Sequence, residues 1–378
     1  MTTDDSHGHA PEPAHDDAHG AHDHADGEHD HAAHAHGHDH PHAHGDDGHS
    51  HAHGHDDAHA APSEVVDEKP LGPPRKTVQV GDVGFSVIDV GTGPVVLFLH
   101  GFPTSASLWR HVIDAMGKSC RCIAPDLLGL GNTECPADAD YGLDRQAELI
   151  LELMTKLGVE GEFSVVGHDW GGIVAEVLAA TAPERVAKLV LLDCPAFAVD
   201  QPPVVKRLVL GARFSVVWDF LCDTGFLRWF ATSDGGLRAG AYEPDALSNE
   251  AIAEYIRPLY KDTPPAYRAG RERFRRALLQ VEAEAAAVVA SVADGMRRFE
   301  KPTLVVWGCD DPYVSVSWGK KLADEVPGCV GFELIPFCGH WVPEEKPAVL
   351  AMLIASHLSA PGSPMPADEA AAPATAGA

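Results

Sequence analysis

The chain has 378 residues and a formal net charge of −28, and its length is enough for one large domain or two smaller ones. The acidic balance argues against a nucleic-acid or anionic-membrane partner, and no apolar run approaches the roughly 18 residues of a membrane helix. The N-terminus lacks the basic and apolar regions of a signal peptide, and the eight cysteines show no metal or redox spacing except the loose pair Cys120 and Cys122. We therefore expect a cytoplasmic protein with reduced cysteines.

Residues 1–62 form a low-complexity tail of His, Asp, Ala and Gly. Residues 1–60 hold 19 of the 24 His and 14 acidic residues, but no Lys or Arg. This composition offers too little apolar surface to offset chain entropy, which predicts disorder. Closely spaced imidazoles can bind a divalent metal such as Zn, Ni, Co or Cu, so the tail is a candidate metal-binding segment.

The globular pattern begins after a Pro-rich linker at residues 63–76. Residues 77–80 and 84–90 alternate like an early hairpin, and residues 95–99 form an apolar strand that runs into His100-Gly-Phe-Pro103. A helix is predicted from about residue 105 to 116, a strand at 120–125 and an amphipathic helix at 141–157. The next strand, from residue 163, leads into a helix at 173–180, and another strand follows at 187–192.

The alternation of strands and helices breaks at about residue 196. From there to residue 298 the sequence is helical and irregular, and it holds four of the six Tyr. Strands return at 302–307 and 331–336, with a helix near 315–324 and a last helix from Pro347. The alternation predicts an α/β fold, a mostly parallel sheet with helices on both faces. Residues 77–195 and 299–359 would form its core, residues 196–298 a helical cap inserted before the last two strands, and residues 360–378 a disordered tail.

One stretch, Phe163-Ser-Val-Val-Gly-His-Asp-Trp-Gly-Gly172, has the pattern of a nucleophile elbow. A strand, a sharp turn and a helix follow each other, and Gly167 and Gly171 bracket Asp169. Glycine is needed because the central residue of such a turn is strained and closely packed. A carboxylate that attacks a saturated carbon forms an ester, which water can open at the carbonyl of the enzyme. Asp169 therefore predicts a substrate with an electrophilic sp3 carbon and a leaving group, such as an epoxide or an alkyl halide.

Residues 77–359 resemble the α/β-hydrolases that carry a cap domain, close to the epoxide hydrolases and haloalkane dehalogenases. The motifs that carry the resemblance are His100-Gly-Phe-Pro, Gly167-His-Asp-Trp-Gly-Gly, Gly308-Cys-Asp-Asp and Cys338-Gly-His-Trp, in the family order of nucleophile, acid and histidine. The resemblance implies that His340 is the base that activates water and that His100 is structural. It also implies Asp311 as the acid behind His340, with Asp310 adjacent and Asp193 as the competing candidate.

The backbone N–H groups of Phe102 and Trp170 occupy the family's oxyanion positions. Neither a cofactor nor a metal is needed for this chemistry, and the expected substrate is a small apolar molecule. Family dehalogenases bind the halide through the Trp after the nucleophile and through either an Asn, where this chain has Phe102, or a cap Trp. Family epoxide hydrolases protonate the oxygen with two cap Tyr. The cap candidates for these roles are Trp218, Trp229, Tyr242, Tyr255, Tyr260 and Tyr267.

An epoxide hydrolase is favoured over a haloalkane dehalogenase because of Phe102 and the Tyr-bearing cap. The stretch Phe102-Pro-Thr-Ser-Ala-Ser-Leu-Trp-Arg110 points the other way, since it resembles the dehalogenase version of this loop. A hypothesis from another class is a metal-sequestering protein that uses the hydrolase domain as a scaffold. Deleting residues 1–62 would separate the two, because an enzyme would keep its turnover and a metal buffer would lose its capacity.

Overall fold

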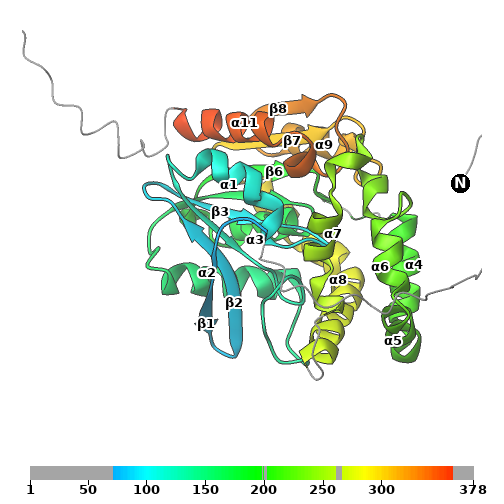
Figure 1. Cartoon of the computed structure of the whole chain (residues 1–378). Coiled ribbons are helices and arrows are strands. Elements are labelled where there is room, and N and C mark those ends of the chain that lie inside the picture. Colours follow the sequence, from blue (N-terminus) through cyan, green and yellow to red (C-terminus); the bar gives the residue numbers. More distant parts are fainter. Residues whose placement is uncertain (1–70, 198, 200–201, 261–265, 361–378) are drawn as a thin grey trace, which may run out of the picture. The chain divides into compact units, whose positions relative to one another are not determined.

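A computed structural model of the chain describes residues 71–197, 199, 202–260 and 266–360. Within these residues the strands form one sheet in the order β1-β2-β4-β3-β5-β6-β7-β8 (Figure 1). The strands are β1 (Arg75–Val80), β2 (Val83–Val90), β3 (Val95–Leu99), β4 (Arg121–Pro125), β5 (Phe163–His168), β6 (Val186–Leu192), β7 (Thr303–Gly308) and β8 (Cys329–Ile335). β1 and β2 pair antiparallel, as do β2 and β4, and all the other pairs are parallel. The predicted mostly parallel sheet is therefore confirmed.

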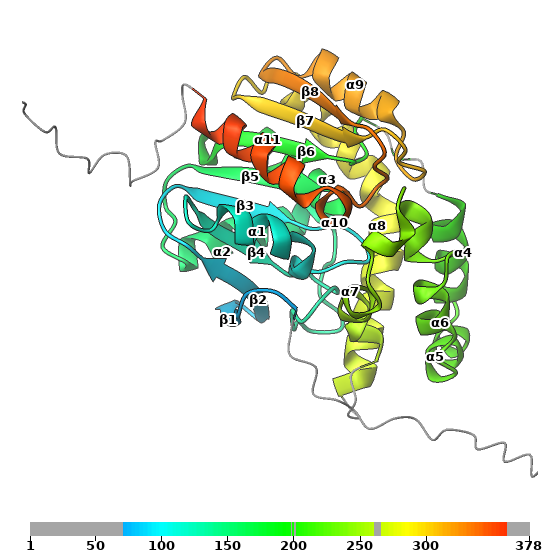
Figure 2. The same ribbon diagram turned by 45° about the horizontal axis from the view of Figure 1, so that its top comes forward.

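Helices cover both faces of the sheet, as predicted. Figure 2 shows α1 and α11 on one face, while α2 and α3 lie on the other. The helices of the strand-and-helix alternation are α1 (Arg110–Met116), α2 (Leu143–Lys156), α3 (Trp170–Thr181), α9 (Val316–Glu325), α10 (Val342–Glu345) and α11 (Pro347–Ser359), with short 3-10 turns η1 (Ala106–Trp109) and η2 (Pro183–Arg185). Because side chains alternate along a strand, β3 supplies both layers. Leu97 and Leu99 pack with the α2 and α3 cluster, and Val96 and Phe98 with the α1 and α11 cluster.

The first strand begins inside the segment that was expected to be linker. Arg75 and Lys76 continue the antiparallel ladder and pair with Ile88 and Val87. The Arg75 guanidinium forms an ion pair with the fully buried carboxylate of Asp126. The linker prediction was wrong at this end because a buried acid far along the chain needs a cation, which local composition does not reveal.

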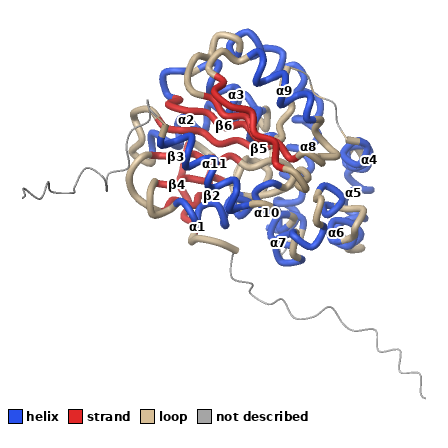
Figure 3. The backbone as a smooth tube through the Cα atoms, turned by 90° about the horizontal axis from the view of Figure 1, so that it is seen from above, coloured by secondary structure: helices blue, strands red, loops and turns tan. Residues whose placement is uncertain are grey.

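A helical segment is inserted between β6 and β7, before the last two strands, as predicted. It contains α4 (Pro203–Ala212), α5 (Ser215–Asp223), α6 (Phe226–Thr232), α7 (Asn249–Tyr255), α8 (Ala266–Met296) and the turns η3 (Leu237–Gly240), η4 (Pro244–Ala246) and η5 (Arg257–Leu259). These helices gather at one end of the strands (Figure 3). α8 packs on α3, and α4 packs on α8, so the insertion stands on the helix that follows the elbow.

Ionic contacts attach α7 to the core of the protein. Glu344 of α10 accepts two hydrogen bonds from the Arg110 guanidinium, at 2.5 and 2.7 Å, and a third from the Tyr255 hydroxyl. Glu254 pairs with Arg75 at 3.4 Å. This part of the insertion is therefore held by charged groups that come from three distant parts of the sequence.

The predicted tails at residues 1–62 and 360–378, apart from Ala360, and the linker up to residue 70 lie outside the described residues. Among the described helices, none is both long and apolar enough to cross a membrane. Among the described residues, no group of three or more His, Cys, Asp or Glu is arranged to hold a metal ion.

Candidate active site

The predicted elbow lies between β5 and α3, with Asp169 at its turn. Asp169 has φ 51° and ψ −119°, a strained conformation for a residue with a side chain. A Cβ at Gly167 would lie 2.5 Å from the carbonyl oxygen of Gly171, and one at Gly171 would lie 2.3 Å from that of Leu99. The space around the turn therefore admits only glycine at both positions, which is the physical reason for the spacing seen in the sequence.

The Asp169 carboxylate is held by the backbone of two loops. Its Oδ2 accepts a hydrogen bond from the backbone N–H of Phe102 at 2.8 Å. Burial raises the pKa of Asp169, against the opposing effects of His340 and of the N–H groups of Phe102 and Trp170. The N-terminus of α3, which starts at Trp170, also favours negative charge here. One carboxylate oxygen is thus bound by the Phe102 N–H that was predicted for the oxyanion position.

His340 and Asp311 meet beside this carboxylate. The Nδ1 of His340 lies 2.9 Å from Oδ2 of Asp311, and the other oxygen of Asp311 accepts the backbone N–H groups of Tyr313 (2.7 Å) and Val314 (3.0 Å). Donation from Nδ1 leaves Nε2 as the proton acceptor. Burial lowers the pKa of His340, but the charges of Asp311 and Asp169 outweigh it, so the pKa is raised overall.

Asp193, the competing acid, does not bind His340 but lies behind Asp311. It is fully buried at the end of β6, and its Oδ1 accepts the backbone N–H of Gly308 at 2.9 Å. Its Oδ2 receives no hydrogen bond from any donor in the described part of the chain, while its carboxyl group is in hydrogen-bonding range of Asp311. Burial, and then the charge of Asp311, raises the pKa of Asp193 well above its ordinary value. Asp310 is exposed.

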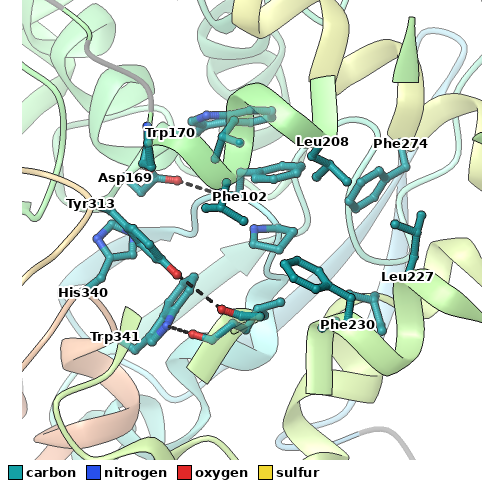
Figure 4. Close-up of a pocket in the computed structure, with 18 of the residues that line it drawn as sticks. Phe102, Asp169, Trp170, Leu208, Leu227, Phe230, Phe274, Tyr313, His340 and Trp341 are labelled. Carbon is teal, nitrogen blue, oxygen red and sulfur yellow. Dashed lines mark hydrogen bonds between the residues drawn. The ribbon is translucent and has the colours of Figure 1, made fainter. Parts of the chain in front are cut away.

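All the predicted site residues except Asp311 open onto an apolar pocket between the core and the inserted helices (Figure 4). Asp169, Trp170, Phe102 and His340 line it, and the Phe102 and Trp170 rings stack with centroids 4.7 Å apart. The apolar wall comes mainly from the insertion, through Val204, Val205, Leu208, Trp218, Leu227, Phe230, Ala231, Ile256, Leu259 and Phe274. Such a wall would keep water low around the carboxylate and would suit small apolar molecules.

Most of the cap residues that were predicted to assist the reaction do not line the pocket. Trp229 is 64% exposed and Tyr242 is 46% exposed, while the Tyr255 hydroxyl is bound to Glu344. The Tyr260 hydroxyl is buried, and neither it nor Tyr255, Tyr242 or Trp229 belongs to the pocket lining. The side chain of Tyr267 lies outside the described residues. Trp218 does line the pocket, and its buried Nε1 makes no hydrogen bond within the described chain.

A tyrosine that sequence reasoning missed is in the pocket instead. Tyr313 stands edge-on to the His340 ring, with centroids 5.3 Å apart, and its hydroxyl donates to the carbonyl of Gly236 at 3.4 Å (Figure 4). Burial, together with the charge of Asp311, raises the pKa of Tyr313 to about 12. Its place two residues after the candidate acid Asp311 was the available signal, because that loop must pass beside His340.

His100 has a structural place, as the resemblance implied. Its Nε2 accepts the backbone N–H of Leu127 at 2.9 Å, and its Nδ1 donates to the carbonyl of Gly101 at 3.0 Å. Burial lowers the pKa of His100 to about 4, so the ring is neutral. A neutral ring that bridges two loops holds the backbone ahead of Phe102 in position.

Comparisons with known proteins show which family the chain is similar to. The alpha/beta hydrolase fold family matches residues 94–347. Haloalkane dehalogenase 2 of Mycobacterium tuberculosis is 30% identical over 279 residues, which cover 71% of this chain and 88% of that protein. The soluble epoxide hydrolase of Corynebacterium sp. is 31% identical over 275 residues, or 69% of this chain and 88% of that protein. The solved structure of the epoxide hydrolase CorEH without ligand is similar with a TM-score of 0.60 and 25% identity, covering 76% of this chain and 98% of that one.

Proposed function

The chain belongs to the α/β-hydrolase fold family, and we propose that it hydrolyses small apolar substrates at an electrophilic saturated carbon, through an ester on Asp169. The observation that carries the proposal is the Asp169 carboxylate, held at 2.8 Å from the Phe102 N–H on a strained elbow, with His340 in the same apolar pocket. A serine at this place would form an ether with saturated carbon, which could not be hydrolysed. The carboxylate forms an ester that can.

The first half of the reaction forms the ester. Oδ1 of Asp169 attacks the substrate carbon, and the bond between that carbon and its leaving group breaks. With an epoxide the leaving oxygen stays attached to the substrate and takes a proton. Among the described residues that line the pocket, Tyr313 is the one with a hydroxyl group, and a phenol with a pKa of about 12 is still a stronger acid than an alcohol. We therefore assign the protonation of the epoxide oxygen to Tyr313 in place of the cap tyrosines.

The second half opens the ester. Nε2 of His340 takes a proton from water as the water oxygen attacks Cγ of Asp169, and Asp311 stabilises the imidazolium that forms. The tetrahedral oxyanion is stabilised by the N–H groups of Phe102 and Trp170. Collapse of this intermediate breaks the bond between Cγ and Oδ1, and the alcohol leaves with that oxygen and with the proton held by His340. The Asp169 carboxylate is restored with the water oxygen in place of Oδ1. When the substrate is an epoxide, the second proton of the water reprotonates Tyr313 and the product is a diol.

An epoxide is the favoured substrate class, because Phe102 replaces a halide-binding Asn and because Tyr313 offers a hydroxyl. Trp218 supports an alkyl halide as the second candidate. Its indole lines the pocket together with Trp170, and its N–H makes no hydrogen bond in the described residues. An indole N–H is a donor suited to a departing halide.

The intact mass of a His340→Gln variant tests both candidates. Without the base, the Asp169 ester should form and persist. We expect an adduct with the full mass of styrene oxide, and a butyl bromide adduct in its place would identify a dehalogenase. The matched control is Asp169→Asn in the same background, which should gain no mass with either compound. A folded His340→Gln variant that stays unmodified by a range of epoxides and halides would refute the Asp169 nucleophile.

A further inference from the structure

Two carboxyl groups lie behind His340, although a catalytic triad needs one. Asp311 binds Nδ1 of His340 at 2.9 Å, and the side chain of Asp311 is 0% exposed. Asp193 is 0% exposed and lies at the end of the neighbouring strand β6, where the carboxyl ends of parallel strands meet. Two ionised carboxylates this close and this deeply buried would repel each other strongly.

The hydrogen bonds around the pair indicate how it avoids this repulsion. Asp311 accepts from His340, Tyr313 and Val314, as an ionised carboxylate does. Asp193 accepts one backbone N–H, from Gly308, while its Oδ2 is buried without any donor among the described residues. A bare anionic oxygen in such a place is costly, but a protonated one becomes a donor, and the Asp311 carboxyl is in range to accept.

We propose that Asp193 is a positioning residue that stays protonated and donates a hydrogen bond to Asp311, so that the two carboxyl groups share one negative charge behind His340. This inference rests on the proposed function and extends it. The donation draws charge on Asp311 away from the edge that faces the imidazole. His340 therefore faces a carboxylate of reduced negative charge. Its ring stays neutral, and able to accept a proton, down to a lower pH than it would beside a carboxylate that receives no hydrogen bond from Asp193.

The other titratable groups described around His340 do not take the positioning role that we propose for Asp193. Asp169 and Glu345 add negative charge that raises the pKa of His340 further. His168 lies beside it with ring centroids 4.7 Å apart, but its Nε2 donates to the His340 carbonyl, and burial lowers the pKa of His168 well below its usual range. Cys194 and Cys338 are neutral thiols, since burial raises the pKa of each.

The pH profile of ester hydrolysis distinguishes three states of Asp193: protonated and donating to Asp311, ionised, or without a hydrogen bond that affects His340. Adduct decay is followed by intact mass after a single turnover of styrene oxide. Asp193→Asn keeps a donor and no charge, and asparagine tolerates the φ of 40° at this position, so the profile should match that of the wild type. Asp193→Ala removes the donor, so the acid limb should move up by about one pH unit. The control is Asp310→Asn, which removes one carboxyl group from the exposed residue next to Asp311.

A downward shift of the acid limb in Asp193→Asn would overturn the proposal, because it would mean that an anion had been removed. An unshifted profile in a folded Asp193→Ala variant would overturn it as well, since the donated hydrogen bond would then have no effect on His340.

A second measurement needs no substrate and therefore separates this inference from the proposed function. A carboxyl that is protonated in the folded protein but titrates near 3.9 when unfolded makes stability fall as pH rises between the two pKa values. The unfolding equilibrium constant of the wild type relative to Asp193→Asn, from urea titrations, should rise about tenfold per pH unit above pH 4. A ratio that stays flat with pH would mean that Asp193 is ionised and would refute the shared charge. If the ratio rises but no ester ever forms, the pair stands and the proposed function fails.

Discussion

The cluster of Arg110, Glu344 and Tyr255 makes a strong prediction about how the insertion is anchored. We change Glu344 to Gln, which is nearly isosteric but removes the only negative charge of the cluster. The Glu344 side chain is 1% exposed and that of Arg110 is 10% exposed, so the guanidinium would be left buried without a counter-charge. Breaking such a pair costs about 3–5 kcal/mol, and we expect about 3 because Gln keeps one acceptor. At about 2–4 °C per kcal/mol, the melting temperature should fall by about 6–12 °C.

The assay is thermal unfolding of Glu344→Gln beside a surface control. Glu148 forms an ion pair with Arg145 at 2.6 Å, but it is 66% exposed, so Glu148→Gln should cost less than about 1 kcal/mol. A double change of Arg110→Met and Glu344→Leu should recover most of the loss, because the uncompensated charge is removed with its partner. Equal melting temperatures for Glu344→Gln and Glu148→Gln would refute the reasoning.

Three further outcomes are expected. Gly171→Ala should give poorly folded protein without turnover, because its Cβ would lie 2.3 Å from the Leu99 carbonyl, and normal circular dichroism with full activity would contradict this. Asp311→Asn should slow ester hydrolysis about 10³–10⁴-fold. It should also move the acid limb to lower pH, since Asp311 raises the pKa of His340, and an upward move in a pH profile would contradict that sign. Deleting residues 1–62 should leave styrene oxide turnover unchanged and abolish nickel binding measured by calorimetry, and nickel binding that persists in the shortened chain would contradict the assignment of the metal to the tail.

Much of the fold could be predicted because its signals are local. The apolar run of β5, the glycines at 167 and 171 and the helical pattern of α3 lie next to each other, and together they define the elbow. Apolar strands that alternate with amphipathic helices gave the parallel sheet for the same reason. The start of β1 at Arg75 was missed because its partner, Asp126, is remote in sequence.

The resemblance favoured Asp311 over Asp193, but the residues alone could not exclude Asp193. Both follow buried strands, and only the position of the His340 ring relative to β6 and β7 distinguishes them. Most of the cap residues that were predicted to assist the reaction do not line the pocket, for a related reason. Whether a tyrosine faces the pocket depends on helix packing. The Tyr255 hydroxyl binds Glu344 away from the pocket, while Tyr313, on a loop of the core, lines it.

The first helices and the middle part of the inserted segment differ in what they contact. Its middle part contacts the catalytic loop directly, since the Gly240 carbonyl accepts the backbone N–H of His340 at 2.7 Å and Glu345 binds the N–H groups of Gly339 and Tyr242. The helices α4 to α6 instead supply apolar side chains to the pocket wall. Exchange of residues 203–232 between relatives can therefore change which molecules fit while the reacting groups keep their spacing. The residues proposed to select the substrate and those proposed to react with it therefore lie on different elements, so the pocket wall can be varied separately from the reacting groups.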